Sequence, residues 1–134
     1  MKKVYDTINQ YCVEHELLTN GDGIVIGLSG GMDSVCLLQV LAALRNEWQL
    51  RLVCVHVHHG IRGTAADEDA AFAQRLAAKY NISFRLYEMD IPQLAKEQGL
   101  SEEEAGRNYR YRCFEEVRKE LNFDKIAVAH HRDD

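Results

Sequence analysis

The stretch SGGMDS, residues 29–34, combines the residue types with which a chain can hold phosphate. Gly30 and Gly31 carry no side chain, so a ligand can approach their backbone closely. An apolar segment follows with helical spacing, and the free amides and dipole of a helix N-terminus attract anions. Asp33 would repel phosphate unless a divalent cation such as Mg²⁺ bridged the two. The stretch therefore predicts a site for a magnesium nucleotide, formed by Ser29, Gly30, Gly31, Met32, Asp33 and Ser34.

A plain glycine turn with a serine cap is the structural alternative, and many α/β domains contain one. The stretch is neither the Walker A pattern G-x-x-x-x-G-K-[ST] nor the dinucleotide fingerprint G-x-G-x-x-G. Taken alone, it leaves both interpretations open.

A second polar cluster, HHGIRG, residues 58–63, follows another apolar run and contains Arg62. Its histidines have no cysteine or acidic partner at the spacing of a zinc site, which argues against a metal centre. We expect the backbone here to hold a base, with His59 and Arg62 facing phosphate or substrate, so His56, His59 and Arg62 are candidate nucleotide-binding residues. A polar strand end followed by a glycine turn is the alternative.

The segment SEEEAGRNYRYRCFEEVRKEL predicts a helix with Arg107 and Arg110 on its inward face. At about 100° per residue, both arginines fall within the apolar stripe rather than opposite it. Buried guanidinium groups are costly without an anion, so a phosphate or substrate site is expected there. An ion pair with a nearby carboxylate is the alternative. The apolar stripe consists of Tyr111, Phe114, Val117 and Leu121, and the solvated face of Arg112, Glu116 and Lys119.

The last eight residues, AVAHHRDD, follow the same order of apolar strand and polar end. Asp133 and Asp134 are candidate Mg²⁺ ligands together with Asp33, because carboxylates are preferred magnesium ligands. His130 is a candidate for stabilising charge or moving a proton. An acidic tail without a defined role is the alternative.

These clusters must be positioned by the elements between them, which alternate between helix and strand. Short, continuously apolar strands separated by helices favour a parallel sheet with helices on both faces, a Rossmann-like three-layer α/β sandwich. In such sheets ligands bind at the carboxyl ends of the strands, where all three polar clusters are expected. The predicted strands are residues 24–28, 50–57, 82–87 and 125–129. The predicted helices are residues 3–18, 34–45, one with a capping signal at Thr64 and Asp67 and apolar Phe72, Leu76 and Tyr80, and 101–121.

Composition limits the class of protein. The chain has 134 residues, a net charge of −5 and a pI of about 5.7, without the basic excess of a broad nucleic-acid surface. It has no long uncharged apolar run and no signal-peptide pattern, so we expect a cytoplasmic protein with no membrane partner. The four cysteines, none in a C-x-x-C pair, are expected to be buried thiols.

The motifs together resemble a known family. SGGMDS after a strand resembles the pyrophosphate loop of the N-type ATP pyrophosphatases, the PP-loop superfamily. The order SGGMDS, HHGIRG, EAGRNYRY, AHHRDD resembles its tRNA(Ile)-lysidine synthetase members, from about residue 24 to residue 134. Ile61 and Gly106 are small departures, a leucine and an alanine being usual there. Family chains continue further, so residues 1–134 are expected to be the N-terminal part of the domain, with an adenine nucleotide alpha hydrolase-like fold.

The resemblance implies an ATP-dependent ligase. ATP would adenylate the C2 carbonyl of the wobble cytidine in isoleucine tRNA, releasing pyrophosphate, and the ε-amine of free lysine would displace AMP. It implies that residues 29–34 hold phosphates and that Asp33 and Asp134 bind Mg²⁺. It further implies that Arg110, supported by Arg107, steadies the phosphate or the activated base, and that His130 lies near the transferred group. Contacts with tRNA are expected mostly outside this chain.

Three other interpretations stay open at this point. One is another tRNA-modifying enzyme of the superfamily, such as a thiolase, which the lack of a C-x-x-C pair disfavours. The others are an ATP-binding module without turnover and a plain α/β scaffold with a glycine turn. The oligomeric state, including a homodimer, is not predicted by these patterns.

Overall fold

The chain folds as alternating strands and helices. The computed structural model describes residues 18–29, 32–60 and 65–129. The helix predicted for residues 3–18 therefore lies almost wholly outside the described residues. The elements, in chain order, are β1 (Gly23–Gly27), α2 (Met32–Trp48), β2 (Arg51–His58), α3 (Ala65–Lys79), β3 (Ser83–Glu88), α4 (Ile91–Gln98), α5 (Glu102–Leu121) and β4 (Lys125–Val128).

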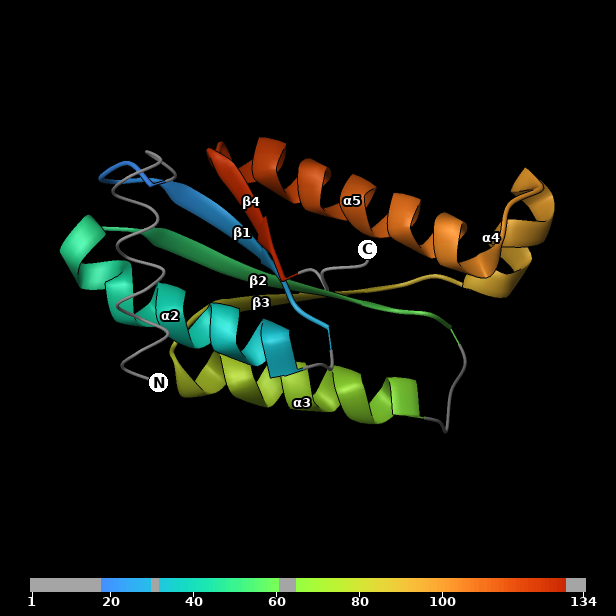
Figure 1. Cartoon of the computed structure of the whole chain (residues 1–134), viewed down its shortest axis with the longest axis horizontal. Helices are drawn as coiled ribbons and strands as arrows, with labels where there is room; N and C mark the ends of the chain where they lie inside the picture. The colour runs from blue at the N-terminus through green and yellow to red at the C-terminus, as the bar shows by residue number, and fades with distance from the viewer. Residues whose placement is uncertain (1–17, 30–31, 61–64, 130–134) are drawn as a thin grey trace.

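The four strands form one parallel sheet in the order β3-β2-β1-β4 (Figure 1). β1 is central, since Ile26 lies opposite Cys54 of β2 on one side and Ala127 of β4 on the other. The chain moves outward from β1 to β2 and β3, and then returns to the opposite side of β1. This reversal makes the carboxyl ends of β1 and β4 a topological switch point, where open parallel sheets bind ligands.

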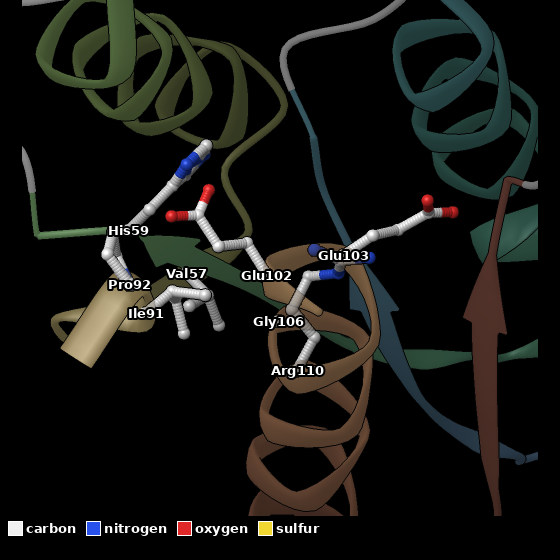
Figure 2. A pocket seen from close by; sticks show the side chains of 8 residues that line it. All are labelled: Val57, His59, Ile91, Pro92, Glu102, Glu103, Gly106 and Arg110. Atoms are coloured by element: carbon white, nitrogen blue, oxygen red, sulfur yellow. The ribbon is translucent and has the colours of Figure 1, made fainter. Parts of the chain in front are cut away.

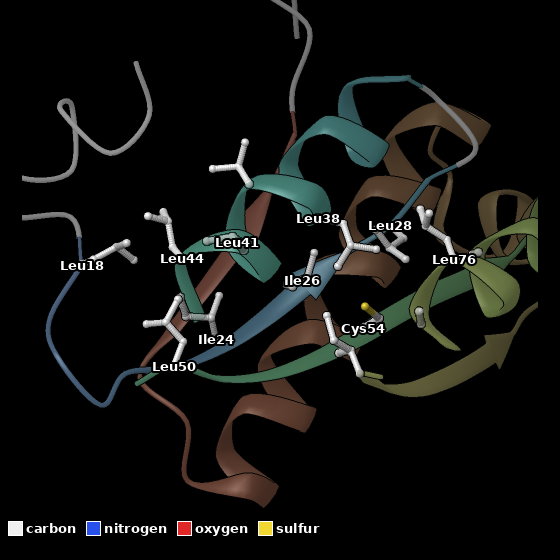
Figure 3. Packing of buried hydrophobic residues seen from close by; sticks show 14 residues of the cluster. Leu18, Ile24, Ile26, Leu28, Leu38, Leu41, Leu44, Leu50, Cys54 and Leu76 are labelled. Carbon is white, nitrogen blue, oxygen red and sulfur yellow. The ribbon is translucent and has the colours of Figure 1, made fainter. Parts of the chain in front are cut away.

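Helices cover both faces of the sheet, as predicted. α2 and α3 lie on one face and α5 lies on the other, with α4 at the N-terminal end of α5 (Figure 1). The larger core lies under α2 and α3 and contains Ile24, Ile26, Leu38 and Leu44 (Figure 3). The smaller core lies under α5, where Phe114 and Val117 pack on the strands. The three-layer α/β sandwich is therefore confirmed.

Most predicted elements occur within a few residues of their expected bounds. Ser101 caps α5 as its capping signal predicted, because its side chain accepts a hydrogen bond of 3.1 Å from the amide of Glu104. The apolar stripe of α5 also packs inward, and its predicted solvated face is exposed at Arg112, Glu116 and Lys119. The α2 helix is longer than predicted at both ends.

The short helix α4 was not predicted. The residues that indicate this helix lie at its two ends. At the start, the Asp90 side chain accepts a hydrogen bond from the amide of Gln93, and Pro92 occupies the first turn. At the other end, Gly99 adopts the left-handed conformation, with a φ of 68°, and ends the helix. Eight residues are too few for a clear apolar period. Here the caps, not the pattern, identify the element.

Helix α3 is confirmed, but Phe72, one of the three apolar residues that indicated it, is 38% exposed. The helix instead buries Ala66, Ala70, Ala73, Leu76 and Ala77. Small alanines let the helix approach the sheet closely, so the larger Phe72 is left at the edge of the contact. The Thr64 half of the capping signal lies outside the described residues.

The structure bears on the expected burial of the cysteines and on the expected lack of a membrane span. Cys54 and Cys113 are buried free thiols and Cys36 is partly buried, while Cys12 lies outside the described residues. Burial raises the pKa of Cys54 to about 12, so that thiol is not reactive. Among the described segments, no helix combines the length and apolarity needed to span a membrane.

Candidate functional site

Ser29 and Ser34, at the two ends of the connection from β1 to α2, are hydrogen-bonded to each other. The Ser34 hydroxyl, at the buried start of α2, accepts a hydrogen bond of 2.9 Å from the Ser29 amide, and the two hydroxyl oxygens lie 2.7 Å apart. These contacts hold the strand end against the first turn of the helix. Gly30 and Gly31 lie outside the described residues, as do the side chains of Met32 and Asp33.

The start of α2 lies where a phosphate site would require it. Helix α2 begins at Met32, three residues after Ser29, so its N-terminal amides lie at the carboxyl end of the central strand. Unpaired amides at that place form an anion site in many α/β proteins. The serine bridge, by itself, would also serve a purely structural turn.

His56 is buried, with 5% of its surface exposed, near the end of β2. Its Nδ1 lies 2.8 Å from the carbonyl oxygen of Leu28, and because a carbonyl can only accept, Nδ1 donates. This bond ties β2 to the residue that leads into the glycine loop. Burial lowers the pKa of His56, and the bond to Leu28 acts in the opposite direction more weakly.

A pH prediction follows from His56. The folded pKa lies below the ordinary 6.5, so the unfolded chain takes up the proton first as the pH falls below that value. The free energy of unfolding should therefore be unaffected by this group above pH 6.5 and should fall as the pH is lowered from there toward the folded pKa. Denaturant titrations at several pH values measure it.

His56→Asn keeps an N–H donor near the same place but removes the titration. We expect its stability to fall less than that of the wild type over the same acidic range. His59→Asn, which alters an exposed imidazole, should keep the wild-type dependence. Equal slopes for His56→Asn and the wild type would contradict the assignment.

His58 makes a contact that the sequence reasoning missed. It is 3% exposed, its Nδ1 accepts from the amide of Gly60 at 2.9 Å, and its Nε2 lies 2.6 Å from Oδ1 of Asp67. Since Nδ1 accepts, Nε2 carries the proton and donates to Asp67. The pair connects the end of β2 to the first turn of α3 on both sides of residues 61–64. Arg62 lies within residues 61–64, outside the described residues, so its role stays a prediction.

A cavity of about 250 Å³ opens where the end of β2 meets α4 and α5 (Figure 2). It brings together His59 and Arg110, two of the predicted site residues, from segments about fifty positions apart. The remaining lining residues are Val57, Ile91, Pro92, Glu102, Glu103 and Gly106. The sequence reasoning did not find this set, because it required the unpredicted helix α4.

The predicted inward orientation of the two arginines of α5 was wrong. Arg107 is exposed and pairs with Glu103 one turn earlier, at 3.2 Å, which is the ion-pair alternative. Arg110 is also exposed, at the cavity wall, and no hydrogen bond or ion pair links it to another described residue. The helix places its apolar residues, not its guanidinium groups, against the sheet.

The third polar cluster follows β4, which pairs with β1 as far as Gly27 and Val128. The carboxyl end of β4 therefore lies beside the carboxyl end of β1, after which the glycine loop begins. His130, Asp133 and Asp134 lie outside the described residues, so whether they meet Asp33 stays a prediction. Within the described ranges, no three His, Cys, Asp or Glu side chains are grouped as metal ligands.

Solved structures share this fold. A U34-tRNA thiolase, NcsA, from Methanococcus maripaludis superposes with a TM-score of 0.79 at 20% identity, over 99% of this chain and 45% of that chain. An NH₃-dependent NAD synthetase from Campylobacter jejuni superposes with a TM-score of 0.69 at 18% identity, over 98% and 57%. At these identities the likeness concerns the fold alone.

Curated sequences are much closer. The chain is 46% identical over its whole length to a tRNA(Ile)-lysidine synthase of Caldanaerobacter subterraneus, and 40% identical over 98% of its length to that of Clostridium tetani. It spans only 28% and 27% of those two proteins. Residues 2–134 match the PP-loop domain family. Because that match covers nearly every residue, the chain belongs to the PP-loop domain family.

Proposed function

We propose that this chain is the ATP-binding part of a tRNA(Ile)-lysidine synthetase. The observation that carries the proposal is the SGGMDS loop at the topological switch point, with Ser29 and Ser34 bonded across it. The similarity to curated lysidine synthases over the whole chain supports the same activity. Residues 1–134 would be the N-terminal part of the catalytic domain in a longer protein.

Under this proposal the glycine loop holds the triphosphate. Gly30 and Gly31 leave room for phosphate oxygens, the amides at the start of α2 face the negative charge, and Ser29 and Ser34 fix the loop between strand and helix. Mg²⁺, held by Asp33 with Asp133 and Asp134, would neutralise charge on the leaving pyrophosphate. Electrostatic positioning is then the main contribution of the chain to catalysis.

The other candidate residues take roles around that loop. His56, buried and bonded to Leu28, would act by positioning the loop near the nucleotide. His59 and Arg62 would face the substrates at the end of β2, and His130 would lie near the transferred group. Arg107 would act by supporting the N-terminal turn of α5 through its pair with Glu103.

The substrates would be isoleucine tRNA and free lysine. The net charge of −5 favours a local RNA contact, with most tRNA binding made elsewhere in the longer protein, in the cytoplasm where its tRNA is used. Size measurements of the full-length protein in solution would test whether it forms a homodimer.

The test is lysine-dependent pyrophosphate release by the full-length protein. With Mg-ATP and isoleucine tRNA, we expect release to require lysine for turnover and the product tRNA to carry lysidine at the wobble position. A tRNA for another amino acid is the control. Equal turnover without lysine and without tRNA would overturn the proposal, and sulfur transfer to the tRNA would point to the thiolase alternative.

A further inference from the structure

His58 is a buried polar side chain to which the proposed function gives no role. It is 3% exposed, and a buried polar ring is costly unless its nitrogens have partners. Here both nitrogens have one: Nδ1 accepts from the amide of Gly60 at 2.9 Å, and Nε2 donates to Oδ1 of Asp67 at 2.6 Å. A ring that accepts at one nitrogen and donates at the other carries one proton and is held in one tautomer.

The two bonds of His58 join different segments of the chain. Gly60 lies two residues further on, past the end of β2, so its bond to Nδ1 holds the backbone as it leaves the sheet. Asp67 lies in the first turn of α3, where the helix dipole favours a carboxylate. The ring thus ties the end of β2 to a helix that packs on the same sheet.

Backbone bonds hold the same turn on its other side, against the start of α4. The amide of Met89 donates to the carbonyl oxygen of His58 at 3.1 Å, and the amide of Ile91 donates to that of His59 at 3.2 Å. Gly60 packs against this backbone, since an added Cβ would lie 2.8 Å from the carbonyl oxygen of Met89. The turn is therefore fixed between α3, through the His58 ring, and α4.

His59 is the residue whose position depends on this turn. Its ring lies at the wall of the cavity between β2, α4 and α5 (Figure 2). The residue is exposed, and among the described residues its ring takes part in no hydrogen bond or ion pair. Its place at the cavity is consequently set by the backbone on either side of it, which His58 and α4 hold.

The role of His58 is separate from that of His56. The two side chains lie two residues apart on the same face of β2, but they bond to different neighbours. His56 bonds to Leu28, which leads into the glycine loop, whereas His58 bonds toward α3. A change at His58 therefore leaves the tie between β2 and the glycine loop in place.

We propose that His58 is a positioning residue for the reaction: its singly protonated ring, bonded to Gly60 and Asp67, orients the backbone that presents His59 to the substrates. This assignment rests on the proposed function, under which His59 faces the substrates at the end of β2. The alternative is a purely structural role, in which the ring only stabilises the packing of β2 against α3.

The test is a double-mutant cycle in the full-length protein, read as kcat/KM for ATP in lysine-dependent pyrophosphate release with isoleucine tRNA. His58→Ala removes both bonds of the ring and should lower kcat/KM about 10-fold. His59→Ala should lower it at least as much. In the His59→Ala background, His58→Ala should change kcat/KM less than about twofold, because the ring that it orients is already gone.

A conservative variant and a matched pair of carboxylates complete the test. His58→Asn places an amide oxygen near the position of Nδ1, where it can still accept from Gly60, and should bring kcat/KM to within about threefold of the wild type. Asp67→Ala, which removes the anchor of the ring, should lower kcat/KM, whereas Glu68→Ala, at the next and exposed position of α3, should not. If His58→Ala does not fold, Asp67→Ala takes its place in the cycle.

The outcomes separate this proposal from the proposed function. Equal effects of His58→Ala in the two backgrounds would overturn the positioning role, because a purely structural defect is independent of His59. Wild-type kcat/KM in His59→Ala would also overturn it. In both cases the wild type would still release pyrophosphate with lysine, so the proposed function would stand. No lysine-dependent release by the wild type would overturn the proposed function itself, and the positioning role with it.

Discussion

Replacing Asp33 with asparagine is expected to slow pyrophosphate release by about 100-fold or more in the full-length protein. The substitution keeps the size of the side chain but removes the charge that would hold Mg²⁺ against the phosphates. The remaining loop amides would still attract the nucleotide, so the loss should fall more on turnover than on ATP binding. Steady-state pyrophosphate release, measured over a range of Mg²⁺ concentrations, tests this.

Two features distinguish a metal role for Asp33 from a structural one. A lost ligand should raise the Mg²⁺ concentration needed for half-maximal activity, whereas a folding defect should not. Glu68→Gln, on the exposed surface of α3, is the matched charge control and should retain full activity. Activity of Asp33→Asn within about threefold of the wild type, with unchanged Mg²⁺ dependence, would refute the metal assignment.

Replacing Gly60 with alanine is expected to lower the free energy of unfolding by about 3 kcal/mol. Its φ of +90° is unfavourable for a residue with a side chain, and an added Cβ would lie 2.8 Å from both the Cα of Asp90 and the carbonyl oxygen of Met89. Both neighbours are backbone atoms, held by the bond from the Met89 amide to the His58 carbonyl. Neither can rotate away, so the clash adds to the backbone strain.

Gly21→Ala is the matched control for that substitution. Gly21 has nearly the same φ, +85°, but no atom lies within 4 Å of an added Cβ. It should therefore cost only the backbone strain, about 1 kcal/mol. Urea titrations of both variants measure the difference, which is the cost of the close approach. If Gly60→Ala costs no more than Gly21→Ala, the packing of β2 against the start of α4 is looser than the structure indicates.

The sequence by itself determined the features that depend on residues close to one another in the chain, namely the secondary structure, a helix cap and the motifs. Alternating apolar strands and helices identify the α/β class, because apolar burial and helix periodicity are local patterns. The capping of α5 by Ser101 follows for the same reason, since the hydroxyl bonds an amide only three residues away. The motifs and their order also resemble those of the PP-loop superfamily, and short motifs of this kind are read directly from the sequence.

Only the tertiary structure decided which distant residues meet. The bond between His56 and Leu28 joins residues 28 positions apart. His59 and Arg110 line the same cavity, together with residues of α4, a helix that the apolar periodicity did not predict. The outward orientation of Arg107 was decided in the same way, because α5 packs Phe114 and Val117 against the sheet and leaves the Arg107–Glu103 pair at the surface. Contacts of this kind depend on strand order and helix packing, in which burial of apolar side chains outweighs the weak preferences of single polar residues.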